Sequence, residues 1–268
     1  MVSLPPSLVQ PQPPALLGIV GIGASAGGLD ALEKFFARVP VRSGLAYIVV
    51  QHLDPTQKAM LAELLQRVTS LVVREAGEAM RVEANHIYVI PPNAELSLMQ
   101  GVLHVVLPTE PRGMRLPVNV LFSSLAREQG ASGIGIVLSG MGSDGTLGLQ
   151  ALKAVGGLTI VQEPSSAQFD AMPQSAIAAG CADIVALPAD MPARILACIA
   201  WDGRSKSPIT DWAADGAPTD EPLDPPVDTI ESIFSLLRKR TRHDFSLYKP
   251  STLNRRIEIG RASCRERV

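Results

Sequence analysis

The chain has little net charge, few cysteines and no long hydrophobic segment among its 268 residues. A formal charge of −2 argues against nucleic acid as the main partner. No uninterrupted apolar run approaches the roughly 18 residues of a transmembrane helix, so we expect no insertion into a membrane. No lysine or arginine precedes Lys34, which leaves no positively charged start for a secretory signal peptide. Together these absences predict a cytoplasmic protein.

The cysteines provide neither a metal site nor a disulfide framework. Cys181, Cys198 and Cys264 lack the close spacing of metal ligands, and disulfides are not expected in a cytosolic protein. Cys181 and Cys198 lie in apolar stretches, which predicts buried free thiols. No cofactor and no bound metal are expected.

Between residues 15 and 200 the sequence alternates between short apolar runs and stretches of helical periodicity. Runs rich in Val and Ile without polar alternation are typical of strands buried on both faces. The predicted strands are Leu17–Gly23, Ala46–Gln51, Leu71–Arg74, His86–Ile90, Gly133–Leu138, Leu158–Val161 and Asp183–Ala186. The alternation predicts an α/β fold with a doubly wound, mainly parallel sheet and helices on both faces.

The helices and one hairpin complete this prediction. Helices are expected over 29–39 and 61–68, and near 117–129, 145–155, 173–179 and 189–200. The exception to the βα alternation is Leu96–Leu98, followed by a turn at 99–101 and by Val102–Val105, which predicts a β-hairpin appended to the sheet.

The flanking segments differ in composition from the α/β region. Residues 1–14 contain five prolines and no periodicity, which predicts a disordered tail. Residues 201–227 contain five prolines and six acidic residues, which indicates a linker. Apolar spacing resumes over 228–258, but about 30 residues with one helical stripe cannot bury a core alone. Residues 259–268 break every pattern and resemble a translated sequencing adapter, so we expect an artefact there.

A serine stands at the junction between the first predicted strand and the first predicted helix. Residues 23–27 read Gly-Ala-Ser-Ala-Gly, a Gly-x-Ser-x-Gly turn in its proper strand-to-helix context. Such a tight bend can project the hydroxyl of Ser25 from the sheet edge. Ser25 alone could equally cap the following helix, and glycine-rich turns of this kind also bind phosphates.

Two further polar residues follow other predicted strands. His52 comes directly after the second strand, and Asp144 lies in the glycine-rich segment 139–145 after the strand that ends at Leu138. Open parallel sheets bind ligands beyond the carboxyl ends of their strands, so Ser25, His52 and Asp144 could meet there as nucleophile, base and orienting acid. Each has an alternative structural role, because a histidine can end a strand and an aspartate can cap a helix.

The same turn permits a different interpretation. Residues 21–26 match the dinucleotide-binding pattern G-x-G-x-x-A between a strand and a helix. That pattern needs an acidic residue at the end of the second strand to bind the ribose. The chain has Gln51 and His52 there, with Asp54 two residues later, so the match is incomplete. Binding of NAD or NADP would distinguish this alternative.

Three segments carry a resemblance to a known family: residues 23–28, 51–52 and 140–145. Together they resemble the catalytic domain of CheB, the chemotaxis protein-glutamate methylesterase family. Residues 86–93 and 169–173 also fit, and the resemblance covers about 16–200. It implies a Ser–His–Asp serine hydrolase that demethylates glutamate methyl esters on methyl-accepting chemoreceptors or related signalling proteins. Many members also deamidate receptor glutamines.

The resemblance assigns Ser25 as nucleophile, His52 as base and Asp144 as orienting acid. Met141 falls where the family lines the oxyanion region. Better-known members have threonine after the nucleophile, whereas this chain has Ala26, whose backbone N–H can still serve the oxyanion.

The flanks depart further from typical members, which carry an amino-terminal receiver domain where this chain has a proline-rich tail. Gating by phosphorylation in the same chain is therefore not expected. Residues 233–252 resemble the start of the CheR receptor methyltransferase, which predicts a truncated CheB–CheR fusion. These departures also support a second hypothesis, a catalytically weak scaffold that binds receptors.

Overall fold

The computed structural model describes residues 15–51, 60–108 and 115–201. The chain divides into two compact units, Met1–Ala197 and Cys198–Val268, and only the end of one helix is described for the second. Within the described ranges, no helix has both the length and the hydrophobicity that crossing a bilayer requires.

Seven strands, all paired in parallel, form the central sheet. They are β1 (Gly18–Ala24), β2 (Leu45–Gln51), β3 (Val72–Glu75), β5 (His86–Val89), β8 (Ile134–Val137), β9 (Leu158–Gln162) and β10 (Ile184–Ala186). Their order is β10-β9-β8-β1-β2-β5-β3. All seven residues of β1 are buried, as expected for a strand at the centre of a sheet covered on both faces. The predicted α/β fold is confirmed.

The direction of winding changes at β1. The chain first moves from β1 to β2 on one side and later returns to β8 on the other side of β1. The loops that follow β1 and β8 therefore border the topological switch point, where open α/β sheets bind their ligands.

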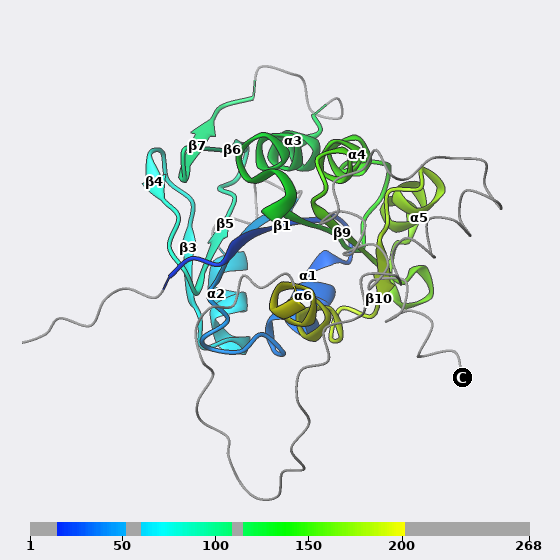
Figure 1. The fold of residues 1–268 in the computed structure, drawn as a ribbon, viewed down its shortest axis with the longest axis horizontal. Coiled ribbons are helices and arrows are strands. Elements are labelled where there is room, and N and C mark those ends of the chain that lie inside the picture. The colour runs from blue at the N-terminus through cyan, green and yellow to red at the C-terminus, as the bar shows by residue number, and fades with distance from the viewer. Residues whose placement is uncertain (1–14, 52–59, 109–114, 202–268) are drawn as a thin grey trace, which may run out of the picture. The chain divides into compact units, whose positions relative to one another are not determined.

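Helices cover both faces of the sheet, with α3 and α4 on one face and α1 and α2 on the other (Figure 1). The six helices of the described ranges are α1 (Gly28–Phe36), α2 (Met60–Val68), α3 (Pro117–Gln129), α4 (Thr146–Ala154), α5 (Ala171–Ala178) and α6 (Met191–Trp201). Helix α5 packs against β8 and β9. Two short 3-10 turns, Gly130–Ser132 and Pro164–Ser166, were not predicted.

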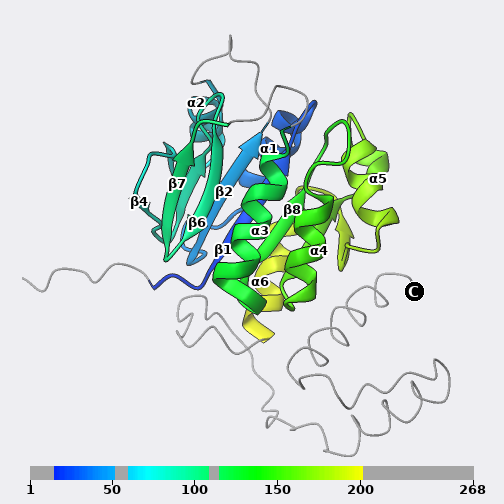
Figure 2. The ribbon, with the colours of Figure 1, turned by 90° about the horizontal axis from the view of Figure 1, so that it is seen from above.

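The predicted hairpin forms, but it pairs with a strand that the sequence analysis missed. Strands β6 (Glu95–Met99) and β7 (Val102–Val106) join β4 (Met80–Arg81) in a separate antiparallel sheet. This sheet lies beside α3 in Figure 2. The two-residue turn has positive φ at Gln100 and Gly101, the geometry that matches the twist of a hairpin. A two-residue strand carries too little periodicity to be recognised.

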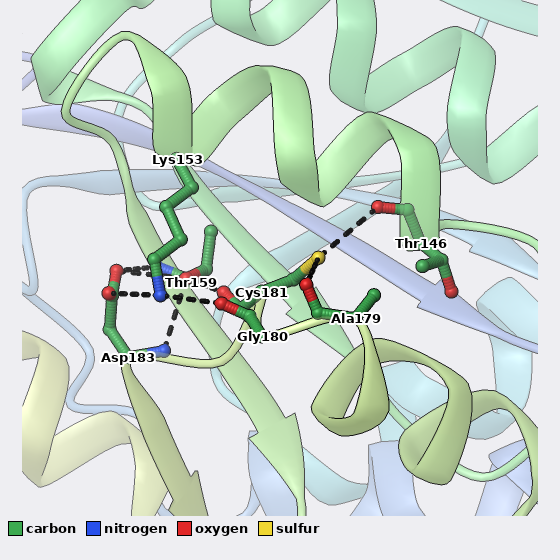
Figure 3. A network of polar contacts seen from close by, with 7 residues as sticks. All are labelled: Thr146, Lys153, Thr159, Ala179, Gly180, Cys181 and Asp183. Atoms are coloured by element: carbon green, nitrogen blue, oxygen red, sulfur yellow. Dashed lines mark hydrogen bonds and ion pairs between the residues drawn. The ribbon is translucent and has the colours of Figure 1, made fainter.

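A polar network joins the end of α4 to β9 and to the start of β10 (Figure 3). The carboxylate of Asp183, whose side chain is 5% exposed, lies 3.1 Å from the Lys153 ammonium. It accepts hydrogen bonds from the backbone N–H and the hydroxyl of Thr159, at 3.2 and 2.8 Å. Cys181 is buried beside this network and burial raises the pKa of its thiol, so the prediction of a buried thiol is confirmed there. Cys198 is only partly buried.

We expect Asp183→Ala to lower the free energy of unfolding by about 2–3 kcal/mol, because the buried N–H of Thr159 loses its acceptor and the Lys153 ammonium loses its ion-pair partner. Chemical denaturation of both proteins measures the difference. Asp30→Ala is the matched control, since it breaks an exposed ion pair with Lys34 that is worth less than about 1 kcal/mol. Equal losses in the two variants would contradict a stabilising role for the buried network.

Candidate active site

Ser25 lies on the tight turn between β1 and α1. Its backbone N–H donates to the carbonyl of Ser139 at 3.0 Å, and its carbonyl accepts from the N–H of Gly28 at 3.0 Å. Gly27 has φ of 70°, and a Cβ there would lie 2.8 Å from the Ser139 hydroxyl. Only glycine fits this position. The turn itself is partly exposed, so a substrate can reach Ser25.

The loop after β8 lies directly against this turn. A Cβ on Gly140 would approach the Cβ of Ser25 to 2.9 Å and would overlap the side chain of Met172 on α5. The absence of a side chain at Gly140 therefore allows the loop to contact Ser25. Met141, the next residue, is 62% exposed.

Ala26 has a backbone N–H for which no acceptor is found among residues 15–51, 60–108 and 115–201. Its carbonyl, by contrast, accepts a hydrogen bond from the Ser139 hydroxyl at 2.9 Å. The N–H that follows the proposed nucleophile is thus a hydrogen-bond donor without an acceptor among the described residues.

His52 lies outside the described residues. The preceding residue, Gln51, pairs in register with Ala24, the residue before Ser25. Strands β1 and β2 therefore end side by side, at Ala24 and Gln51. The side-chain amide of Gln51 lies 3.5 Å from the Ser25 carbonyl, and its buried Oε1 has no partner within the described part of the chain. The sequence did not predict a role for Gln51 in the site.

Asp144 is buried, with 4% of its surface exposed. One carboxylate oxygen accepts from the N–H of Val118 at 3.0 Å, and the other accepts from Asn119 at 3.0 Å and from Gly145 at 2.8 Å. Val118 and Asn119 lie in the first turn of α3, so this carboxylate caps a helix that precedes it in sequence. The capping role considered from the sequence is real, but the helix is α3 and not the following α4.

The start of α3 is close enough for this contact because Gly23 has no side chain. A Cβ on Gly23 would lie 2.2 Å from a methyl group of Val118. Helix α3 therefore packs its first turn directly against the carboxyl end of β1. This close approach presents the N–H groups of α3 to Asp144, whose negative charge is favourable near a helix N-terminus.

Three further residues hold the site together and were not singled out from the sequence. The hydroxyl of Ser139 accepts from the N–H of Phe169 at 3.0 Å, and the N–H of Ser139 donates to the side chain of Gln162 at 2.8 Å. Ser139 and Gln162 are buried, at 0% and 2% exposure. Nothing in the spacing of these residues shows that they meet, because the contacts join segments 23 and 30 residues apart in the chain.

The other histidines lie away from this edge of the sheet or outside the described residues. His86 begins β5 and lines a cavity of about 640 Å³ near the amino ends of β3 and β5. His104 contacts Glu78, whose pKa is lowered by hydrogen bonds from the N–H of Val105 and from His104. His243 is not described. In the described ranges, no three His, Cys, Asp or Glu side chains gather as metal ligands.

The fold and the site define a doubly wound α/β protein with a serine turn at its switch point. A family model described as CheB methylesterase matches residues 20–195. The chain therefore belongs to the CheB methylesterase family.

Similar proteins agree with this assignment. The protein-glutamate methylesterase/protein-glutamine glutaminase of Photorhabdus laumondii is 34% identical over 185 residues, which is 68% of this chain and 53% of that protein. Protein 2 of the same name from Methanosarcina acetivorans is 37% identical over 180 residues, or 64% of this chain and 50% of that protein. The chain spans about half the length of these curated relatives.

A solved structure covers the same region. The crystal structure of the Thermotoga maritima CheB methylesterase catalytic domain matches with a TM-score of 0.62 and 28% sequence identity. The match covers 67% of this chain and 97% of that domain. The α/β region therefore corresponds in fold to that domain.

Proposed function

We propose that this chain hydrolyses glutamate methyl esters on chemoreceptors or related signalling proteins, and that it also deamidates glutamines. The observation that carries this proposal is the placement of Ser25 on a tight, partly exposed turn at the topological switch point. The family assignment and the names of the curated relatives support the same activity. They favour it over dinucleotide binding.

The proposed reaction uses Ser25, His52 and Asp144 in two steps. His52 takes the hydroxyl proton as the Ser25 oxygen attacks the γ-carbonyl carbon of the ester. The tetrahedral intermediate collapses to an acyl-enzyme, and methanol leaves with the proton from His52. Water then attacks the acyl group with His52 again as base, which releases the free carboxylate and restores Ser25.

Asp144 has the chemistry to orient His52 while it caps α3. A carboxylate offers about four acceptor positions, so three backbone donors do not exhaust its capacity. The same donors hold the carboxylate in one orientation. A rigid carboxylate can select the imidazole tautomer and stabilise the imidazolium that forms during the reaction.

Backbone N–H groups stabilise the oxyanion in this proposal. The N–H of Ala26 follows the nucleophile and has no acceptor in the described ranges. The N–H of Met141, next to Gly140, is the second candidate. A well-aimed donor of this kind contributes on the order of 3 kcal/mol to the transition state.

The flanking segments add a further part to the proposal. We propose that residues 201–227 are a linker, that 228–258 begin a CheR-type methyltransferase domain, and that 259–268 are an artefact; all but Trp201 lie outside the described residues. A link between an esterase and a methyltransferase would place opposing reactions on the same receptor glutamates. We propose a cytoplasmic location, since the resemblance implies receptors as substrates.

Methanol release from membranes carrying methylated chemoreceptors tests this function. We expect release above the level of a Ser25→Ala control, and labelling of wild-type protein by a serine-reactive fluorophosphonate at the peptide that contains Ser25. Receptor binding without methanol release or labelling would favour the scaffold alternative. Release of methanol with the label on another serine would contradict the assigned nucleophile.

A further inference from the structure

Ser139 contacts the nucleophile turn at two points. Its carbonyl accepts the N–H of Ser25 at 3.0 Å, and its hydroxyl lies 2.9 Å from the carbonyl of Ala26. The same hydroxyl lies 3.2 Å from the carbonyl of Phe169 and accepts the N–H of Phe169 at 3.0 Å. Because the hydroxyl has one proton, donation to the nearer carbonyl of Ala26 leaves its lone pairs for the N–H of Phe169.

These two contacts fix the backbone on both sides of the peptide that joins Ser25 to Ala26. The carbonyl of that peptide is held by the N–H of Gly28 at 3.0 Å. A trans peptide is planar, with its carbonyl and its N–H pointing in opposite directions. Anchoring the Ser25 carbonyl and both flanking groups therefore determines where the N–H of Ala26 points.

Ser139 is itself anchored to the sheet. Its N–H donates to the side-chain oxygen of Gln162, the last residue of β9, at 2.8 Å. The amide of Gln162 in turn donates to the carbonyl of Ser166 at 3.1 Å. Ser139 is fully buried, so water does not reach its hydroxyl to replace these bonds.

We propose that the hydroxyl of Ser139 is a positioning group that holds the Ser25–Ala26 peptide in the orientation in which the N–H of Ala26 faces the developing oxyanion. This inference rests on the proposed function, because it assumes that Ser25 is the nucleophile. Without the hydroxyl, the carbonyl of Ala26 loses its donor, so the backbone on the Ala26 side of the Ser25–Ala26 peptide is no longer anchored and the N–H of Ala26 can shift. Since a mis-aimed donor no longer stabilises the transition state, the loss should fall on kcat and not on KM.

The test compares two buried serine-to-alanine variants in the full chain. Ser139→Ala is the test variant. Ser124→Ala is the matched control, because Ser124 is 1% exposed, donates to the carbonyl of Leu121 at 2.7 Å and accepts the N–H of Leu98 at 3.0 Å. The Ser124→Ala variant therefore also loses one hydrogen bond donated within α3 and one accepted from β6. We measure kcat, KM and the rate of fluorophosphonate labelling for each variant. The amount of label bound at completion gives the concentration of folded protein, and kcat is calculated from that concentration.

We expect Ser139→Ala to lower kcat and the labelling rate by 10- to 100-fold with KM changed less than twofold. For Ser124→Ala, kcat, KM and the labelling rate should each stay within twofold of the wild-type value. The pH dependence of labelling should be unchanged in Ser139→Ala, because the proposed base is untouched. Ser139→Thr, which keeps the hydroxyl, should recover most of the rate if it folds.

Several results would overturn the proposal. Equal kcat losses in Ser139→Ala and Ser124→Ala would show a general effect of destabilisation, and an unchanged kcat in Ser139→Ala would remove the positioning role. A folded Ser139→Thr no faster than Ser139→Ala would also overturn it. If wild-type protein is labelled at Ser25 but does not hydrolyse methyl esters, the substrate is wrong and the labelling rates still decide the role of Ser139. If Ser25 is not labelled at all, both proposals fail.

Discussion

Replacement of Ser25 by alanine is expected to lower methanol release by about 10⁴- to 10⁶-fold, the range seen when the nucleophile of a serine hydrolase is removed. The fold should survive, because the hydroxyl of Ser25 has no hydrogen-bond partner among the described residues, whereas its backbone is held at both ends. Steady-state methanol release gives the loss in rate, and thermal unfolding followed by circular dichroism tests the fold.

Ser165→Ala is the control for this variant. Ser165 is exposed and bonds only to the nearby side chain of Glu163 among the described residues, so its loss should leave the rate within twofold of wild type. A Ser25→Ala protein that retains more than a few per cent of wild-type turnover would rule out Ser25 as the nucleophile. Retained turnover would also remove the basis for the two-step reaction.

Asp144→Asn is expected to have two separable effects. Turnover should fall by about 10³- to 10⁴-fold, because an amide no longer selects the productive imidazole tautomer. The free energy of unfolding should also fall by about 2 kcal/mol, since an amide nitrogen would face a backbone N–H that the carboxylate now accepts. Turnover is measured by methanol release, and stability by denaturant unfolding.

Asp170→Asn provides the comparison, because Asp170 stands at the N-cap of α5 and has no proposed part in the reaction. It should change turnover by less than twofold. If Asp144→Asn loses stability but keeps turnover, Asp144 is a capping residue for α3 alone. If it loses turnover with no change in stability, the three backbone hydrogen bonds contribute less than their geometry indicates.

Much of the fold followed from local sequence signals. The inner parallel strands have buried runs rich in Val and Ile. All seven predicted strands are present in the sheet, within a residue or so at most ends. The hairpin was predicted because its turn residues and its alternation lie within ten residues. Strand β4 was missed because its two residues pair through a contact with β7 that no local pattern encodes.

The candidate site was predictable only in part, for a related reason. Ser25 and Asp144 could be placed after strands, and the sheet order brings those strands together. Their catalytic roles stay predictions, as does that of His52, which is not described. The bonds of Asp144 to the start of α3 and of Ser139 to Ala26 join residues 25 or more positions apart. Such contacts depend on how the helices and loops pack, which the sequence does not show locally.

The switch point also has a consequence for biosynthesis. The serine turn belongs to the earliest strand of the chain, whereas the anchor for Ser139 lies on β9, more than 100 residues later. Domains emerge from the ribosome from the amino end onward, so a partly synthesised chain contains Ser25 well before it contains Gln162. A growing chain that still lacks β9 therefore has the serine turn but not the residue that anchors Ser139 behind it.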